Sequence, residues 1–138
     1  MLKRIISLFA LVPAAVLLLA STPALARLQP VYNPEPIQVP SGKSLVQVRK
    51  AIRKAIFDKG WEAKEISPNH IVATYTKSGR GKEYTAVVNI EYDTRTVRIT
   101  YKDSRDLDYN PAKDKIHPTY NRWVQFLERN IRADLGAY

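Results

Sequence analysis

The sequence contains no cysteine among its 138 residues, and it has only two histidines. The absence of cysteine excludes disulfide bonds, thiol nucleophiles and metal sites built from thiolates. Two histidines also argue against a zinc site, because zinc sites draw most of their ligands from cysteine and histidine. Small exported domains often depend on disulfides, so a domain of this size without them must be stabilised by its hydrophobic core.

The residues at 106–117 partly resemble a calcium-binding loop. Asp106, Asp108 and Asn110 stand at alternate positions. However, Pro111 and His117 occupy the places where that loop needs a glycine and a glutamate. The basic stretch SGRGK also lacks the glycine and lysine spacing of a phosphate-binding loop and leads into a predicted strand. We therefore predict no metal and no cofactor.

Residues 1–26 have the features of a secretory signal peptide. Lys3 and Arg4 precede an apolar run from residue 5 to residue 20, and an A-x-A sequence ends at Ala26. The apolar run is short for a membrane span. We expect cleavage near Ala26, a periplasmic or secreted location, and no transmembrane segment in the mature chain.

The chain has few acidic residues for its number of basic ones. The formal charge is +9, and removal of Lys3 and Arg4 with the signal peptide leaves +7. A basic protein attracts acidic partners over long range. Export makes nucleic acid a poor partner, so an anionic envelope surface or an acidic protein is expected.

Residues 27–43 contain four prolines, which predicts an extended N-terminal arm ahead of a single domain at 44–138. Proline fixes the backbone and removes a hydrogen-bond donor. We expect the stretch PIQVP, residues 36–40, to be able to lie along a sheet edge.

Two helices are predicted, one on each side of a strand-rich region. The first covers residues 44–59 and ends at Gly60; the second covers 118–135 and ends at Gly136. Each has a stripe of apolar residues three and four positions apart. In the second helix the predicted core stripe comprises Tyr120, Trp123, Val124, Leu127 and Ile131. Replacement of Trp123 by alanine is then expected to cost on the order of 3–5 kcal/mol.

Between the helices the apolar period changes to two, which predicts antiparallel strands. The predicted strands cover residues 61–67, 70–77, 84–93 and 96–103. A two-residue turn at Thr94-Arg95 pairs Tyr92 with Val97, and a loop SGRG pairs Tyr75 with Tyr84. The predicted fold is α+β: helix, four-stranded antiparallel meander, helix, with both helices packed on one face of the sheet.

The exposed face of the first helix is unusually basic. Between residues 43 and 59 there are six basic residues and one acidic residue. Such a face is often merely solvated, but it could also bind an anionic partner. The candidate binding stripe comprises Arg49, Lys50, Arg53 and Lys54.

A second candidate site is polar and lies near the second helix. Ser104, Asp106 and His117 are residue types that serve as nucleophile, orienting carboxylate and base. Their spacing matches no known catalytic motif, and no G-x-S-x-G elbow is present. We assign no catalytic residue.

The motifs "GW", "YKDS" and "IHPTYNRW" resemble small exported proteins and predicted lipoproteins of proteobacteria that have no assigned activity. The resemblance covers most of residues 44–131. It implies no catalytic residue, and this chain departs from many of those proteins because it lacks the lipid-anchored cysteine.

These observations favour a non-enzymatic periplasmic binding or adaptor module with a basic surface for an anionic partner. The alternative is a small periplasmic enzyme with a site near Ser104, Asp106 and His117.

Overall fold

The computed structural model describes residues 27–138, and the predicted signal peptide lies outside the described residues. The described elements, in chain order, are β1 (Gln29–Pro30), β2 (Ile37–Gln38), α2 (Leu45–Asp58), β3 (Glu62–Ser67), β4 (His70–Gly79), β5 (Lys82–Tyr92), β6 (Thr96–Arg105), β7 (Lys115–Ile116) and α3 (Pro118–Leu135).

The fold is α+β with an antiparallel sheet, but the predicted architecture around a four-stranded meander is wrong. The main sheet has five strands in the order β2-β6-β5-β4-β3, and β1 pairs with β7 in a separate two-stranded sheet. The fifth strand comes from the proline-rich arm, where Ile37 pairs with Val97. Because Pro36 and Pro40 flank it, this strand is confined to two residues at the sheet edge. Strands so short leave no alternating pattern in the sequence.

One of the two predicted hairpin registers is confirmed. Tyr92 pairs with Val97 across the turn between β5 and β6. The register between β4 and β5 differs by two residues, since Tyr75 pairs with Ala86 and not with Tyr84. The turn there has two residues, where the sequence suggested four. A shift of two residues keeps the same side chains on the same face of the sheet, so the predicted inward face is retained.

Both helices begin at a residue whose side chain caps the first turn. At the start of α2, the Ser44 hydroxyl and the Gln47 side chain each accept a backbone N–H of the other residue. His117 caps α3 ahead of Pro118, and Gly136 ends it in the left-handed conformation, with φ of 78°. No helix within residues 27–138 combines the length and apolar character needed to cross a membrane.

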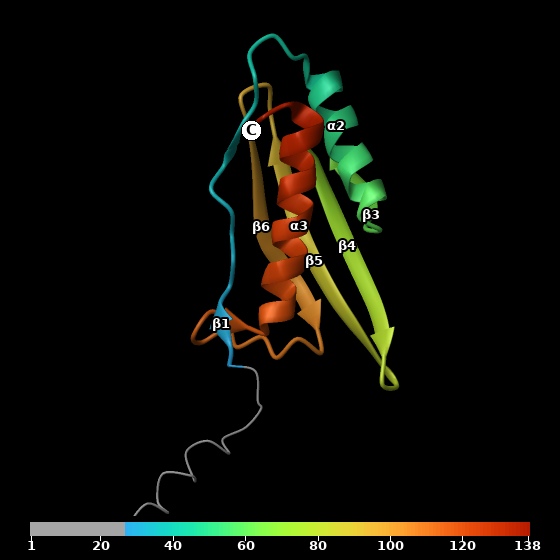
Figure 1. The fold of residues 1–138 in the computed structure, drawn as a ribbon, viewed down its shortest axis with the longest axis vertical. Helices are drawn as coiled ribbons and strands as arrows, with labels where there is room; N and C mark the ends of the chain where they lie inside the picture. The colour runs from blue at the N-terminus through green and yellow to red at the C-terminus, as the bar shows by residue number, and fades with distance from the viewer. Residues whose placement is uncertain (1–26) are drawn as a thin grey trace, which may run out of the picture.

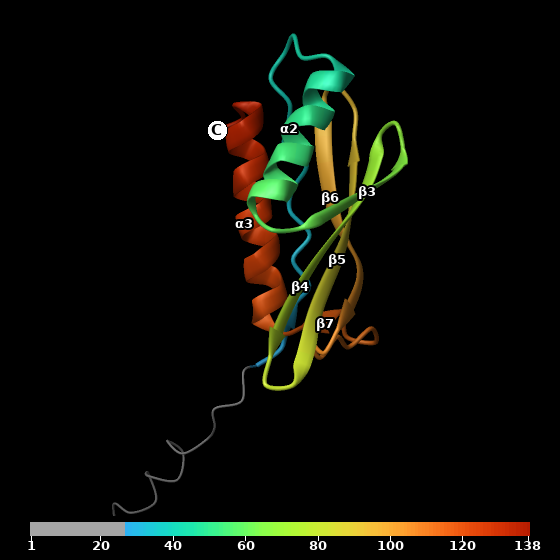
Figure 2. The ribbon, with the colours of Figure 1, turned by 90° about the vertical axis from the view of Figure 1, so that its right-hand side faces the viewer.

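The two helices pack against each other and cover the apolar face of the sheet (Figures 1 and 2). Fully buried side chains from both helices and from β4, β5 and β6 form one core. The largest of the fully buried side chains include those of Ile52, Ile71, Ile90, Tyr120 and Leu127. Figure 1 also shows that α2 is shorter than the hairpin of β4 and β5, whose far end extends past it.

The proline-rich arm runs along α3 and is held there by buried polar side chains (Figure 1). The Asn121 side chain accepts the Tyr32 N–H at 2.9 Å and donates to the Pro30 carbonyl at 3.0 Å. The Tyr32 hydroxyl donates to the Glu128 carboxylate at 2.5 Å. Burial, together with this hydrogen bond, raises the pKa of Tyr32 to about 12. The arm is therefore part of the folded domain.

Candidate binding groove

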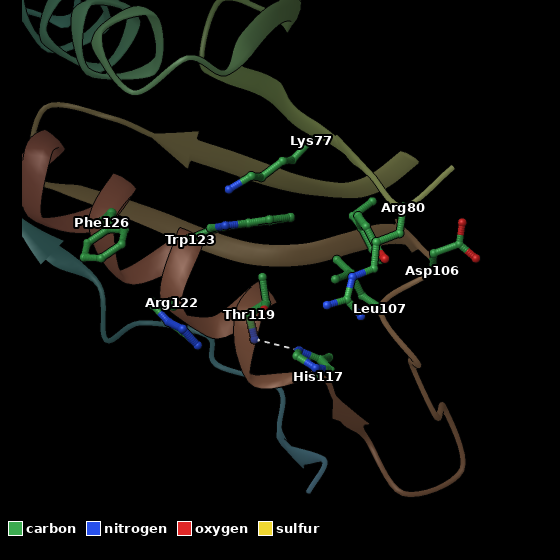
Figure 3. Close-up of a pocket in the computed structure, with 10 residues that line it drawn as sticks. Lys77, Arg80, Asp106, Leu107, His117, Thr119, Arg122, Trp123 and Phe126 are labelled. Atoms are coloured by element: carbon green, nitrogen blue, oxygen red, sulfur yellow. Dashed lines mark hydrogen bonds between the residues drawn. The ribbon is translucent and has the colours of Figure 1, made fainter. Parts of the chain in front are cut away.

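A groove of about 730 Å³ lies between the far end of the β4–β5 hairpin and the first half of α3 (Figure 3). It forms because α2 has 14 residues and α3 has 18, so α2 ends before it reaches this part of the sheet. The volume lies within the range of small-ligand sites, about 300–1,000 Å³.

Three cationic side chains line the groove from two sides. Lys77 and Arg80 come from the hairpin, and Arg122 comes from α3 (Figure 3). Within the described part of the chain, none of the three forms a salt bridge or a side-chain hydrogen bond. Asp106 also lines the groove, but its carboxylate points away from the other labelled side chains in Figure 3. The three positive charges are therefore available to a ligand.

The walls between these charges are largely aromatic and aliphatic. They comprise Tyr84, Leu107, Trp123 and Phe126. Trp123 was predicted to lie in the core, but it is only half-buried and lines the groove, whereas the other four residues of the predicted stripe are fully buried. Its ring meets Tyr75 edge-on at 4.8 Å between centroids, and Tyr75 in turn packs on Trp61 at 5.5 Å. This stack fixes the ring of Trp123 at the groove wall.

One ring nitrogen of His117 is hydrogen-bonded to the backbone at the start of α3. Its Nδ1 accepts the Thr119 backbone N–H at 3.0 Å, as the dashed line in Figure 3 marks. In the neutral ring the proton must then lie on Nε2. His117 therefore adds a possible hydrogen-bond donor to the groove.

Arg80 occupies a backbone conformation that is costly for its residue type. The turn between β4 and β5 consists of Arg80 and Gly81, with φ angles of 51° and 76°. Two positive φ angles define a type I′ turn, in which asparagine followed by glycine is the preferred pair. A left-handed residue other than glycine costs about 1–2 kcal/mol, less for asparagine. Such strain often marks a functional residue, and here the strained residue brings a guanidinium into the groove.

The predicted basic stripe on α2 is largely committed to carboxylates of the same chain. Arg53 pairs with Glu65, and Arg49 lies 3.8 Å from the same carboxylate. Lys54 donates to Asp58 at 2.7 Å, and this hydrogen bond raises the pKa of Lys54. Among the four stripe residues, Lys50 alone forms no salt bridge with another described residue.

The predicted polar site is only partly brought together. Asp106 and His117 both line the groove, but Ser104 does not. The Ser104 hydroxyl is hydrogen-bonded to the Tyr101 hydroxyl at 2.8 Å, and no hydrogen bond joins it to Asp106 or His117 in residues 27–138. Across those residues, no group of three or more histidine, aspartate or glutamate side chains is placed to hold a metal ion.

The roles of Lys77, Arg80 and Arg122 and the position of Trp123 were not predicted from the sequence. One signal was present for Lys77. It continues the inward-facing series of Ile71, Ala73 and Tyr75 along β4, and a cation at an inward position indicates either a buried charge or an opening in the core. Arg80 reaches the groove because the turn between β4 and β5 has two residues, whereas the sequence suggested four.

Known proteins add little to this description. No protein-family model matches the chain, and no curated protein does. Among solved structures, the chain is similar to the vertebrate conserved region of human METTL16, with a TM-score of 0.41 and 11% sequence identity. That match covers 72% of this chain and 80% of the human domain. A likeness at this level carries no argument about function.

Proposed function

We propose that the mature protein is a non-enzymatic periplasmic or secreted binding or adaptor module that holds an acidic partner in the groove beside α3. The observation that carries this proposal is the set of three cations, Lys77, Arg80 and Arg122, which flank an apolar wall and form no salt bridge with any residue of 27–138. Export is part of the proposal and rests on the predicted signal peptide.

The chemistry of the groove suits a carboxylate-bearing ligand with apolar parts. Arginine presents a planar array of donors that matches a carboxylate in two parallel hydrogen bonds. A single exposed ion pair is worth only about 0.2–1 kcal/mol. Affinity must therefore come from several pairs together and from contact with Trp123 and Tyr84. We expect reversible binding that weakens as salt rises.

The groove is a better candidate than the stripe on α2. Recruiting Arg49, Arg53 or Lys54 to a ligand would break an existing ion pair, whereas Arg80 and Arg122 form no ion pair with the part of the chain that the structure describes. The exchange of one ion pair for another yields little net free energy.

A binding role is also favoured over a catalytic one. A hydrolytic site would need a hydroxyl within reach of a base. Ser104 instead pairs with Tyr101, and the Nδ1 of His117 is occupied by the backbone of α3.

The proposal is tested by charge reversal in the groove with a matched control. One variant replaces Lys77, Arg80 and Arg122 with glutamate. The control replaces three exposed or half-exposed lysines away from the groove, Lys43, Lys50 and Lys64, with glutamate, which changes the net charge equally. Binding of a fluorescent hexaglutamate peptide is followed by anisotropy at low salt, and circular dichroism checks that both variants are folded.

We expect the wild type and the control to bind the peptide with similar affinity and the groove variant to lose binding. Equal losses in the two variants would mean that only net charge matters. Undiminished binding by the groove variant would contradict the proposal.

A further inference from the structure

We infer that the partner offers an extended peptide segment with two acidic side chains at positions i and i+3 and apolar residues between them. One acidic side chain would bind in the groove, and the other would bind in a second hollow farther along α3. This inference rests on the proposed function and adds the form of the ligand.

The second hollow adjoins the groove through a shared aromatic residue. It has a volume of about 300 Å³ and is lined by Lys59, Phe126, Arg129 and Asn130. Phe126 lines both hollows and is 41% exposed. The guanidinium of Arg129 lies 4.9 Å from the centre of its ring, and the ammonium of Lys59 lies 5.9 Å from it. Neither cation forms a salt bridge within the described chain.

The two hollows are spaced for an extended chain. Arg122 and Arg129 are seven residues apart on α3, which corresponds to about 10 Å along the helix axis. An extended peptide in the polyproline II conformation advances about 3.1 Å per residue, and its three residues per turn place side chains i and i+3 on the same side, about 9 Å apart. Acidic side chains at i and i+3 would therefore meet one arginine each, with the segment between them over Phe126.

The lining favours a peptide over an acidic oligosaccharide. A sugar chain needs many neutral hydrogen-bond partners for its hydroxyl groups, and an unpaired polar group in a binding site lowers affinity. The neutral polar side chains among the lining residues are Tyr84, His117, Thr119, Asn130 and, through its indole N–H, Trp123. The Asn130 amide already donates to Asp134, and the Nδ1 of His117 already accepts from the backbone, so few donors and acceptors remain for a sugar chain. Apolar peptide side chains would instead match Trp123 and Phe126.

The test compares two peptides of the same composition. The first places two glutamates at i and i+3 around leucine and phenylalanine, and the second places the glutamates next to each other. Both are measured against the full mature chain and against a variant in which Lys59 and Arg129 are replaced with glutamine. Each of these two cations is exposed and forms no salt bridge with another residue of the described range 27–138. The variant should therefore fold, and circular dichroism verifies this.

We expect the spaced peptide to bind the wild type about fivefold more tightly than the adjacent one, as one or two additional exposed ion pairs would give. The variant should bind both peptides alike. Equal binding of the two peptides by the wild type, or a preference that survives in the variant, would overturn the inference. The proposed function would stand in that case if both peptides still required Lys77, Arg80 and Arg122. Tighter binding of an oligogalacturonate than of either peptide would overturn the choice of a peptide.

Discussion

The turn that carries Arg80 allows stability and binding to be separated by one substitution. Replacement of Arg80 by asparagine keeps the two-residue turn and places there a residue that tolerates positive φ. The φ of 51° at Arg80 lies in the left-handed region, and arginine there costs about 1–2 kcal/mol. Because asparagine recovers part of this, Arg80→Asn should stabilise the fold by about 0.5–1 kcal/mol.

The corresponding change in melting temperature is measurable. In a domain of this size, 1 kcal/mol shifts the midpoint by about 4–8 °C. We therefore expect Arg80→Asn to melt about 2–8 °C above the wild type in a thermal scan followed by circular dichroism. The same variant should bind hexaglutamate more weakly, since it removes one of three groove cations. Arg80→Lys is the control, because it keeps both the charge and the strained conformation.

Two results would refute this reasoning. A melting temperature for Arg80→Asn equal to or below that of the wild type would show that the turn is not strained by arginine. Unchanged peptide affinity in a stabilised variant would show that the conformation at Arg80 does not serve binding in the groove.

Three further predictions concern the arm and the core. The pKa of Tyr32 is raised from 10.0 to about 12, so the stabilisation by the protonated hydroxyl is complete below pH 10 and is lost between about pH 10 and 12. The difference in unfolding free energy between the wild type and Tyr32→Phe should therefore shrink over that range. A constant difference in urea titrations would contradict this. Within residues 27–138 the buried hydroxyl of Tyr120 has no hydrogen-bond partner. Tyr120→Phe should therefore be neutral or raise the unfolding free energy by about 1 kcal/mol, and a clear loss of stability in chemical denaturation would contradict this. Asn121→Ala leaves the Tyr32 N–H and the Pro30 carbonyl without their partner and should lower the unfolding free energy by about 2–4 kcal/mol. If the arm of this variant resists protease as well as that of the wild type, Asn121 does not hold the arm.

Elements with a strong local signal could be predicted from the sequence. The bounds of α3 follow from Pro118 and Gly136, which have distinct backbone preferences. The β5–β6 register follows from the alternation of apolar residues and a short turn. In both cases neighbouring residues contain all the necessary information.

Features that depend on distant contacts could not be predicted. The sequence indicated that PIQVP could lie along a sheet edge, and Ile37 does so, but its pairing with β6 depends on a strand about 60 residues away in the chain. Asn121 holds an arm that lies about 90 residues earlier in the chain. The groove depends on the different lengths of α2 and α3 and on the position of the hairpin tip. The sequence pattern did not indicate that most of the basic stripe is paired. Glu65 and Asp134, which are among the carboxylate partners of Arg49, Arg53 and Lys54, lie on other elements.

An acidic partner should bind in the groove beside α3 and not on α2. Amide chemical-shift mapping of ¹⁵N-labelled residues 27–138 during titration with the spaced acidic peptide distinguishes the two surfaces. We expect the perturbed amides to gather at residues 77–84 and 117–130, with little change at 49–54. Perturbations concentrated at 49–54, or none anywhere at peptide concentrations that saturate the anisotropy signal, would contradict the account.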